Sequence, residues 1–238
     1  MKKQPIEVEA AENVCTSDFA DTDAYDRRIK RFVPYYSEMI EGVLSCLPEK
    51  ESDIAALELG CGSGNLTKKM LKEYPCAKLL AIDLTEQMVE KCRRNLLHYS
   101  KRIRVVRADM ISFCQKNRFD YALSNLALHY PGTDEKKMTV CENVWRSLKP
   151  GGLFSFSVML NGKSPAVTKR IWKCWEQDVL QAGVTQEELD EWYGTNHASD
   201  HPVPPNKWLE WLKKLGFTNC EFVWNKTIFG IFRVMKPL

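Results

Sequence analysis

Residues 57–65 read Leu-Glu-Leu-Gly-Cys-Gly-Ser-Gly-Asn, and this stretch decides the fold of the 238-residue chain. An apolar strand pattern runs directly into three glycines at alternate positions, and a helical pattern begins after them. Glycines at the carboxyl end of a strand let the backbone turn sharply and let a ligand approach the main chain closely. The stretch therefore predicts a strand, a ligand-binding turn and a helix. Taken alone, a glycine-rich loop is also compatible with a plain tight turn.

Strand and helix patterns alternate on both sides of this loop. Short apolar runs predict five strands, at 54–59, 78–82, 103–106, 119–124 and 153–159. Amphipathic stretches predict helices between them, at 65–73, 85–98 and 134–148. Apolar strands that alternate with amphipathic helices indicate a parallel sheet covered on both faces. We therefore predict an α/β protein with a doubly wound, Rossmann-like sheet that is mostly parallel.

The two ends of the chain complete this prediction. Residues 1–22 are polar and acidic without periodicity, so we expect a loose lead-in followed by a single domain over 23–238. Within that domain we expect a helical cap at 23–50, broken just before Pro34, and a helical lid insertion at 161–206. The last apolar runs predict a C-terminal antiparallel hairpin that brings the sheet to seven strands, at 220–225 and 228–234 with a turn around Lys226 and Thr227.

Charge and hydropathy exclude several classes of protein. The chain has 34 basic and 31 acidic side chains, a net charge of +3, which argues against a dedicated binder of polyanions. Its basic pairs, such as Lys136-Lys137, are interpreted as solvated helix faces because acids alternate with them. No apolar run approaches the roughly 20 residues of a membrane span, and acids occupy the place of a secretory signal. We therefore expect no membrane association.

The nine cysteines are scattered along the chain and form no CxxC pair. A zinc ribbon or a thioredoxin-like motif is therefore not predicted. An odd number of scattered cysteines is typical of a reducing compartment, so we expect a cytoplasmic location.

The carboxyl ends of the first three predicted strands carry the glycine loop, an acid and an acid in this order. Glu58 precedes the glycine loop, Asp83 ends the second strand, and Asp109 with Met110 follows the third. A carboxylate at the second position suits the two hydroxyls of a ribose, and an acid next to an apolar residue suits an adenine. Asn65 stands where a dinucleotide fingerprint has its third small residue, which argues against the alternative of a nicotinamide dehydrogenase. The carboxyl ends of these strands therefore predict an adenosine-type site.

These segments resemble the motifs of the class I S-adenosylmethionine-dependent methyltransferases. The resemblance covers about residues 25–236 and is carried by ELGCGSG at 58–64, LLAID at 79–83, RADM at 107–110, FDYALSNLALHY at 119–130 and LKPGG at 148–152. A closer likeness, to the branch containing carboxy-S-adenosylmethionine synthase and wobble-uridine tRNA methyltransferase-like proteins, is carried by RFVPYYSEM at 31–39, AIDLTEQMVEKCRRN at 81–95 and the tail at 207–236.

The resemblance implies S-adenosyl-L-methionine as the cofactor. The cofactor-binding residues that it implies are Tyr36, Glu58, Gly60, Cys61, Gly62, Gly64, Asp83, Leu84, Met88, Asp109, Met110, Asn125 and Leu126. The synthase of this branch uses an arginine in its late insertion to hold an extra carboxylate. The sequence has no arginine between Trp175 and Asn206, which favours plain methyl transfer over chemistry on a carboxylated cofactor.

Methyl transfer from a sulfonium depends mostly on positioning and on a water-poor pocket, with a general base only for a protonated acceptor. His129, just beyond the fourth strand, is our main candidate for that base, and Tyr130 is a weaker one. The alternative is that His129 shapes the pocket through a hydrogen bond to a loop carbonyl.

Two other groups of side chains in the late insertion have competing interpretations. His197 and His201 are four residues apart but lie in a loop-like stretch without a third ligand, so no metal site is predicted. Asp200 or His201 is instead an alternative acceptor contact from a lid. Five tryptophans at helical spacing are interpreted as core, with an acceptor-selecting lid as the alternative: Trp172, Trp175, Trp192, Trp208 and Trp211.

The sequence as a whole predicts a methyltransferase, an enzyme that moves a methyl group to a small-molecule acceptor by in-line displacement. A tRNA-modifying methyltransferase is the alternative within the class, and the near-neutral charge balance argues against it. A non-catalytic, regulatory S-adenosylmethionine-binding protein is the alternative from another class. A homodimer is a further alternative that the sequence leaves undecided.

Overall fold

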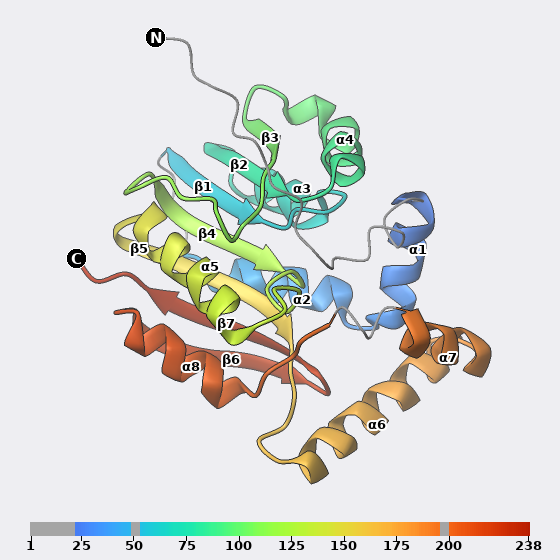
Figure 1. Ribbon diagram of the computed structural model, residues 1–238. Helices are drawn as coiled ribbons and strands as arrows, with labels where there is room; N and C mark the ends of the chain where they lie inside the picture. The colour runs from blue at the N-terminus through green and yellow to red at the C-terminus, as the bar shows by residue number, and fades with distance from the viewer. Residues whose placement is uncertain (1–21, 49–52, 196–199) are drawn as a thin grey trace.

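The computed structural model describes residues 22–48, 53–195 and 200–238 (Figure 1). Its centre is a seven-stranded sheet in the order β3-β2-β1-β4-β5-β7-β6. The strands are β1 (Ile54–Leu59), β2 (Ala77–Asp83), β3 (Ile103–Arg107), β4 (Phe119–Asn125), β5 (Leu148–Met159), β6 (Thr218–Lys226) and β7 (Phe229–Met235). The helices are α1 (Thr22–Phe32), α2 (Tyr36–Ser45), α3 (Asn65–Glu73), α4 (Glu86–Asn95), α5 (Asp134–Ser147), α6 (Pro165–Gln181), α7 (Gln186–Thr195) and α8 (Pro205–Lys214).

The sheet has the predicted doubly wound, mostly parallel topology. Strands β1 to β5 pair in parallel, and β7 lies antiparallel between β5 and β6. The chain runs outward from β1 to β3 on one side and then from β4 outward on the other, so the strand order reverses between β1 and β4. Ligands bind at such a reversal, beyond the carboxyl ends of the strands. The topology thus places the glycine loop after β1 at the edge where a ligand site is expected.

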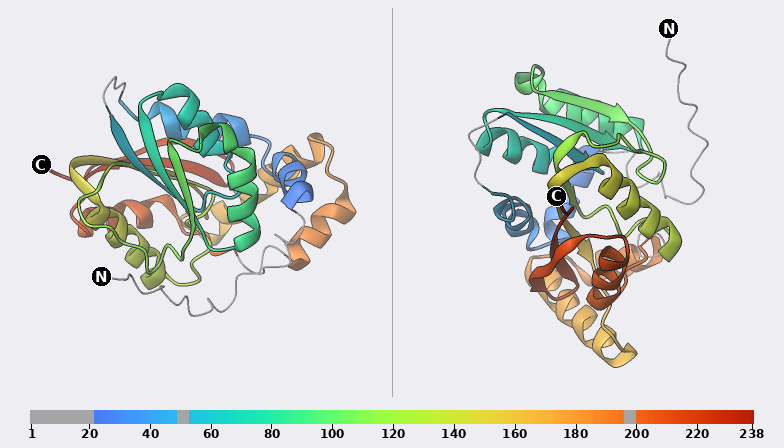
Figure 2. Two further views of the ribbon diagram at one scale, coloured as in Figure 1. Left: turned by 90° about the horizontal axis from the view of Figure 1, so that it is seen from above. Right: turned by 90° about the vertical axis from the view of Figure 1, so that its left-hand side faces the viewer.

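Helices cover both faces of the sheet, as Figure 2 shows. On one face, apolar side chains of α2 and α3 pack against β1, β2 and β4 in one cluster, and α4 packs against β2 and β3 beside it. On the other face, α5 and α8 pack against the sheet in the largest cluster. The near-continuous burial of β1, β4 and β5 follows from this double cover.

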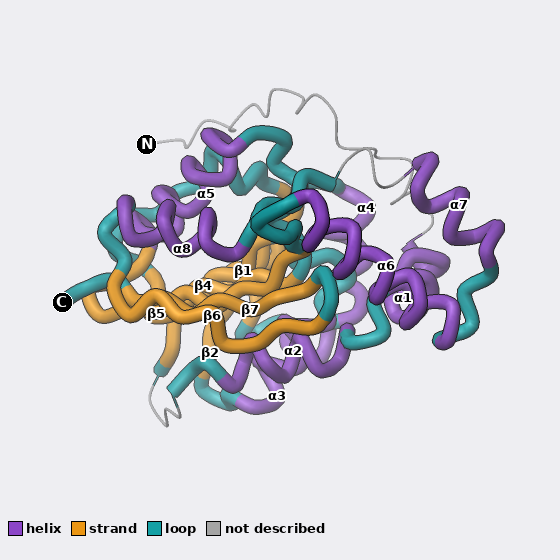
Figure 3. The backbone as a smooth tube through the Cα atoms, turned by 90° about the horizontal axis from the view of Figure 1, so that it is seen from below, coloured by secondary structure: helices purple, strands orange, loops and turns teal. Residues whose placement is uncertain are grey.

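A third group of helices lies beyond the carboxyl ends of the strands. Figures 1 and 3 show α1, α6 and α7 together at that side of the molecule. Their contact is an aromatic and apolar cluster that contains Phe32 from α1, Trp172 and Trp175 from α6, and Trp192 from α7. The five tryptophans at helical spacing are all buried, which confirms the core interpretation, although Trp172 also lines a cavity described below.

Most element boundaries agree with the sequence prediction, and the differences have local causes. Helix α1 ends at Phe32 and α2 begins at Tyr36, so the break falls around Pro34 as predicted. The helix expected over 85–98 ends at Asn95 and continues as a short 3₁₀ helix. Strand β5 begins at Leu148, earlier than its apolar run, because Leu148 already pairs with Phe119 of β4, ahead of a register irregularity before the pair Tyr121 and Leu153.

The C-terminal hairpin is confirmed with a small shift of its turn. Strand β6 continues to Lys226, so the turn is formed by Thr227 and Ile228, and Thr227 adopts a φ of +47°. The lead-in over 1–21 lies outside the described residues. The division into one domain with a cap and a lid insertion stays a prediction. No helix in the described ranges combines the length and the apolar character that crossing a bilayer requires.

One prediction about surface charge is wrong. Lys137 was expected on a solvated helix face, but it is 1 % exposed and its ammonium donates a hydrogen bond to the carbonyl of Pro131. The reason is that α5 presents Lys137 toward the segment that follows β4, on the same side as the buried Val140 and Cys141. Alternating charges along a helix therefore did not reveal which lysine the fold buries.

Candidate functional site

The glycine loop after β1 adopts a conformation that side chains rarely allow. Gly60, Gly62 and Gly64 have φ values of +65°, +51° and +89°. A Cβ on Gly60 would lie 2.3 Å from the Cβ of Ala127, so the loop after β1 touches the loop after β4. A Cβ on Gly62 would meet nothing within 4 Å. The loop is therefore packed tightly at its start and open at its middle, where a ligand can approach the backbone.

Asp83 at the end of β2 holds this loop in shape. One carboxylate oxygen accepts a hydrogen bond from the Gly62 amide at 2.9 Å, and the other accepts from the Thr85 amide at 3.1 Å and from its hydroxyl at 3.2 Å. Burial raises the pKa of Asp83, and these donors oppose that rise. Asp109 after β3 is also fixed, because it accepts from the Ile111 amide at 2.8 Å. The predicted acids thus lie at adjacent strand ends.

Glu58 is a buried carboxyl beneath the glycine loop. It is 1 % exposed, and the hydroxyl of Thr67 on α3 donates a hydrogen bond to it. Burial raises its pKa to about 8, with a smaller contribution from the nearby Asp83 charge. Glu58 is therefore mostly protonated at neutral pH, and a cation placed beside it would favour the ionised carboxylate.

Helix α1 closes the space above the glycine loop. A cavity of about 20 Å³ remains there, which is room for about one water. Its lining joins Tyr25 on α1 to residues from α2, the glycine loop, α3 and the end of β4. Burial, and then the neighbouring Tyr130, Tyr36 and Asp83, raise the pKa of the Tyr25 phenol. Ligand pockets usually measure about 300–1,000 Å³, so this cavity is too small for a nucleoside while α1 covers it.

Polar contacts fasten α1 at both ends. Near its start, Asp26 accepts a hydrogen bond from Ser63 in the glycine loop at 2.5 Å and forms a 3.0 Å ion pair with the buried Lys91 on α4. Near its end, Arg31 forms a 2.6 Å ion pair with Glu188 on α7. The helix therefore bridges the glycine loop and the late insertion. No sequence motif marks these residues, and the resemblance did not point to them.

His129 lies in the segment after β4, where the fold brings it next to Asp200. Its Nε2 is 3.4 Å from Asp200 Oδ1, and the two side chains are 2 % and 6 % exposed. Its Nδ1 is buried without a hydrogen-bond partner among the described residues. The Tyr130 ring lies against it at a centroid distance of 4.4 Å. An imidazole with one nitrogen beside a carboxylate and the other open is the arrangement of a general base.

The structure brings together most of the predicted site residues. Those that line the small cavity are Tyr36, Glu58, Gly60, Cys61, Gly62, Asn125 and Leu126. Those that lie at the neighbouring helix and strand ends, outside its lining, are Gly64, Asp83, Leu84, Met88, Asp109 and Met110. His201 is exposed, and its predicted neighbour His197 lies outside the described residues.

Two contacts fix the walls of the small cavity. Asn125 accepts a hydrogen bond from the Ser157 hydroxyl at 2.6 Å, which sets its amide at the end of β4. The Tyr36 hydroxyl accepts from the Asn65 amide at 3.3 Å, and burial raises the pKa of Tyr36 to about 12. Both side chains thus hold fixed polar atoms at this edge of the sheet.

Residues 56–152, from β1 into β5, match a family model described as a methyltransferase domain. This segment contains the glycine loop, Asp83 and Asp109, with the geometry given above. Over this segment the chain is similar to the class I S-adenosylmethionine-dependent methyltransferases. Carboxy-S-adenosyl-L-methionine synthases are among the proteins it resembles, in agreement with the likeness seen in the sequence.

Curated proteins similar to this chain align with it over part of their length. It is 29% identical over 110 residues to a malonyl-[acyl-carrier protein] O-methyltransferase of Priestia megaterium, which covers 46% of this chain and 38% of the relative. It is 28% identical over 152 residues to a carboxy-S-adenosyl-L-methionine synthase of Pectobacterium atrosepticum, which covers 61% of this chain and 60% of the relative. The alignments thus span about two fifths and three fifths of these relatives.

Solved structures share the fold of this chain. The N-methyltransferase NodS of Bradyrhizobium japonicum, crystallised with S-adenosyl-l-homocysteine, superposes with a TM-score of 0.66 at 17% identity. The superposition covers 93% of this chain and 96% of that chain. At this identity the likeness concerns the fold.

Proposed function

We propose that the protein transfers a methyl group from S-adenosylmethionine to a small-molecule acceptor by in-line displacement. The observation that carries this proposal is the alignment of the glycine loop, Asp83 and Asp109 at the carboxyl ends of β1, β2 and β3 within the segment that matches the methyltransferase domain. The names of the two relatives support an acceptor group of small size, because one names a malonyl group on an acyl-carrier protein as its methyl acceptor and the other names carboxy-S-adenosyl-L-methionine as its product.

The residues present fit this cofactor. The open side of Gly62 leaves space against the backbone, the Asp83 carboxylate suits ribose hydroxyls, and Asp109 with Met110 suits an adenine. The buried Glu58 carboxyl and the Tyr36 hydroxyl suit the charged amino-acid end. When bound, S-adenosylmethionine supplies an electrophilic methyl group, which bonds to the acceptor's lone pair as the carbon–sulfur bond breaks and leaves its electrons on sulfur.

His129 and Asp200 supply the acid–base part of the mechanism in this proposal. Nδ1 of His129 accepts the proton of the acceptor, and Asp200, 3.4 Å from Nε2, keeps the proton on Nε2 so that Nδ1 stays a base. Burial of both side chains keeps competing water away from this nitrogen. We assign plain methyl transfer, since no arginine lies between Trp175 and Asn206 to hold a carboxylated cofactor.

A two-step experiment tests the proposed function. We expect calorimetry to show binding of S-adenosylmethionine to the full chain, and labelled methyl groups to enter the small-molecule fraction of a cell extract. Binding without transfer would instead identify a non-catalytic cofactor-binding protein. Label in the nucleic-acid fraction would identify a tRNA-modifying enzyme, and absence of cofactor binding would contradict the assignment altogether.

Cofactor binding is expected to release a proton from Glu58. Because its pKa is raised to about 8, the carboxyl is protonated in the free protein at pH 7, and a cation bound beside it favours the ionised form. The affinity for S-adenosylmethionine should therefore rise between about pH 6 and 8, by up to about tenfold per pH unit, and level off above. Calorimetry at pH 7 in two buffers of different ionisation enthalpy counts the released protons.

Glu58→Gln isolates this contribution from the amino group of the cofactor, which titrates near pH 8 in every variant. We expect about one proton fewer to be released by Glu58→Gln than by the wild type, and a flatter dependence of affinity on pH. Glu41→Gln on the exposed face of α2 is the matched control and should behave as the wild type. Equal proton release by wild type and Glu58→Gln would place the cation elsewhere.

A further inference from the structure

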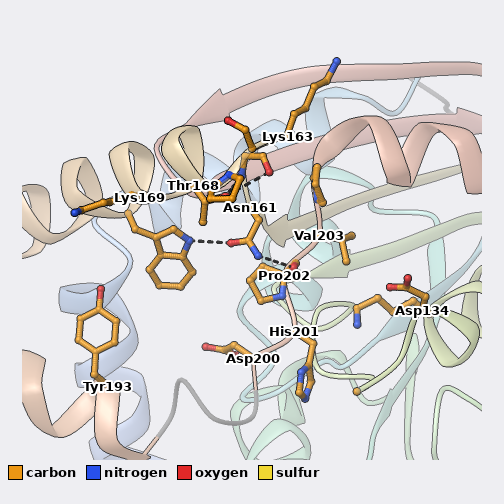
Figure 4. A pocket seen from close by; sticks show the side chains of 17 residues that line it. Asp134, Asn161, Lys163, Thr168, Lys169, Tyr193, Asp200, His201, Pro202 and Val203 are labelled. Atoms are coloured by element: carbon orange, nitrogen blue, oxygen red, sulfur yellow. Dashed lines mark hydrogen bonds between the residues drawn. The ribbon is translucent and has the colours of Figure 1, made fainter.

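A second, larger cavity is lined by Asp200, the residue that approaches His129. It measures about 950 Å³, within the range of small-molecule sites, and is formed by α6, the start of α5 and the segment before α8. Figure 4 shows Asp200 and His201 on one side of it and Tyr193 on another. Asp200 approaches His129 within 3.4 Å, and the His201 amide donates to the His129 carbonyl at 3.1 Å. The cavity therefore adjoins the proposed base.

The wall of this cavity contains a buried ammonium group that is not fully bonded. Lys137 is 1 % exposed, and its one hydrogen bond goes to the Pro131 carbonyl. A lysine has three donors, so two are left without an acceptor among the described residues. Within those residues no carboxylate forms an ion pair with Lys137. A buried charge without an anionic partner is costly, which points to a partner that comes from outside the chain.

The carboxylates of this cavity are already engaged. Asp134 forms an ion pair with Lys207 on α8, and Asp200 faces His129. By contrast, Lys163 and Lys169 are exposed at the rim and form no ion pair within the described ranges. Three lysines line the cavity against two carboxylates, and one of these carboxylates, Asp134, is paired with a lysine outside the lining, so the cavity presents an excess of positive charge that attracts anions.

An aromatic wall completes the cavity. Trp172 donates from its indole nitrogen to Asn161 at 3.0 Å, and Tyr193 donates its hydroxyl to Glu176 at 2.7 Å. The two rings lie 6.4 Å apart between centroids. Their hydrogen bonds fix the orientation of both rings, so they offer a preformed apolar surface to a ligand.

We propose that this cavity binds the methyl acceptor, and that the acceptor is a small molecule with a carboxylate or phosphate group. Its anionic group lies at Lys137, and its apolar part lies against Trp172 and Tyr193. The inference rests on the proposed function, because it assigns the acceptor of that reaction. It explains why the fold buries a lysine beside the base while leaving two of its donors unused.

Titration of the cofactor-loaded full chain with model anions tests this inference without turnover. The probes are phenyl phosphate and benzoate, which separate a phosphate from a carboxylate, and benzyl alcohol as the uncharged counterpart. We expect one of the two anions to bind at least about tenfold more tightly than benzyl alcohol. Equal binding of the anions and benzyl alcohol, or no binding of either anion, would overturn the proposal.

Two lysine variants locate the anion. Lys137→Met keeps the apolar stem and should weaken binding of the preferred anion at least about tenfold. Lys169→Gln at the exposed rim, which does not disturb the core, should weaken it about threefold. Lys72→Gln on the exposed face of α3 is the control and should leave it unchanged. Thermal unfolding checks that Lys137→Met is folded. If that variant is unfolded, unchanged binding in Lys169→Gln overturns the proposal.

The labelled products of the transfer experiment supply the second measurement. We expect the labelled small molecule to be retained by an anion exchanger at neutral pH. A neutral or cationic product would overturn the inference while leaving the proposed function intact. Absence of any transfer would contradict the proposed function instead, and the binding of the model anions would then decide the inference alone.

Discussion

Replacing His129 with glutamine is expected to lower kcat for methyl transfer by about 10²- to 10⁴-fold, the usual contribution of a general base. The affinity for S-adenosylmethionine should stay within about twofold of the wild type, because His129 does not line the small cavity at the glycine loop. The reason for the loss is the removal of Nδ1, which is buried and unpartnered in the described structure. Single-turnover transfer rates and calorimetry measure the two quantities.

Two further variants test whether His129 takes part in catalysis or only shapes the pocket. Asp200 acts through His129, so Asp200→Asn should lower kcat while KM for the cofactor holds. His98→Gln on the exposed 3₁₀ helix serves as the control. Full activity of His129→Gln would show that this side chain only shapes the pocket.

Asp83→Ala is expected to weaken S-adenosylmethionine binding at least tenfold, which corresponds to about 1.4 kcal/mol or more. Two effects combine in this loss. The variant removes the carboxylate proposed to hold the ribose hydroxyls, and it leaves the Gly62 amide, which donates to Asp83 at 2.9 Å, without its acceptor. Calorimetric titration with the cofactor measures the change.

Asp83→Asn distinguishes these two effects, since it keeps an oxygen that can accept from Gly62 but removes the charge. We expect it to bind more tightly than Asp83→Ala and more weakly than the wild type. Asp53→Ala, at the exposed start of β1, is the matched control. Unchanged affinity of Asp83→Ala would refute the assignment of this residue to the cofactor.

The fold and the strand-end acids were predictable because each depends on a short stretch of sequence. The near-continuous apolar run of β1 follows from burial on both faces, and the glycines after it follow from positive φ angles. Acids at or just beyond the end of a strand are placed by the strand itself, as for Asp83 and Asp109. The seven-stranded arrangement and the C-terminal hairpin therefore agree with the sequence prediction.

Long-range contacts account for what the sequence did not reveal. Lys137 reads as half of a basic pair on a charged helix, and only packing against the segment after β4 buries it. Asp26 lies in a charged helix without a motif, and its partners Ser63 and Lys91 are far from it in the chain. The approach of Asp200 to His129 likewise spans two elements. No local pattern encodes such pairs.

The contacts that hold α1 in place bear on the turnover rate of the proposed reaction. The same helix that covers the small cavity contacts the glycine loop through Asp26 and α7 through Arg31. On the proposed function, spent cofactor would have to pass this helix, so we expect these contacts to slow release of the by-product and to limit turnover. The eleven-residue helix α1 would thus both enclose the bound cofactor and slow its release.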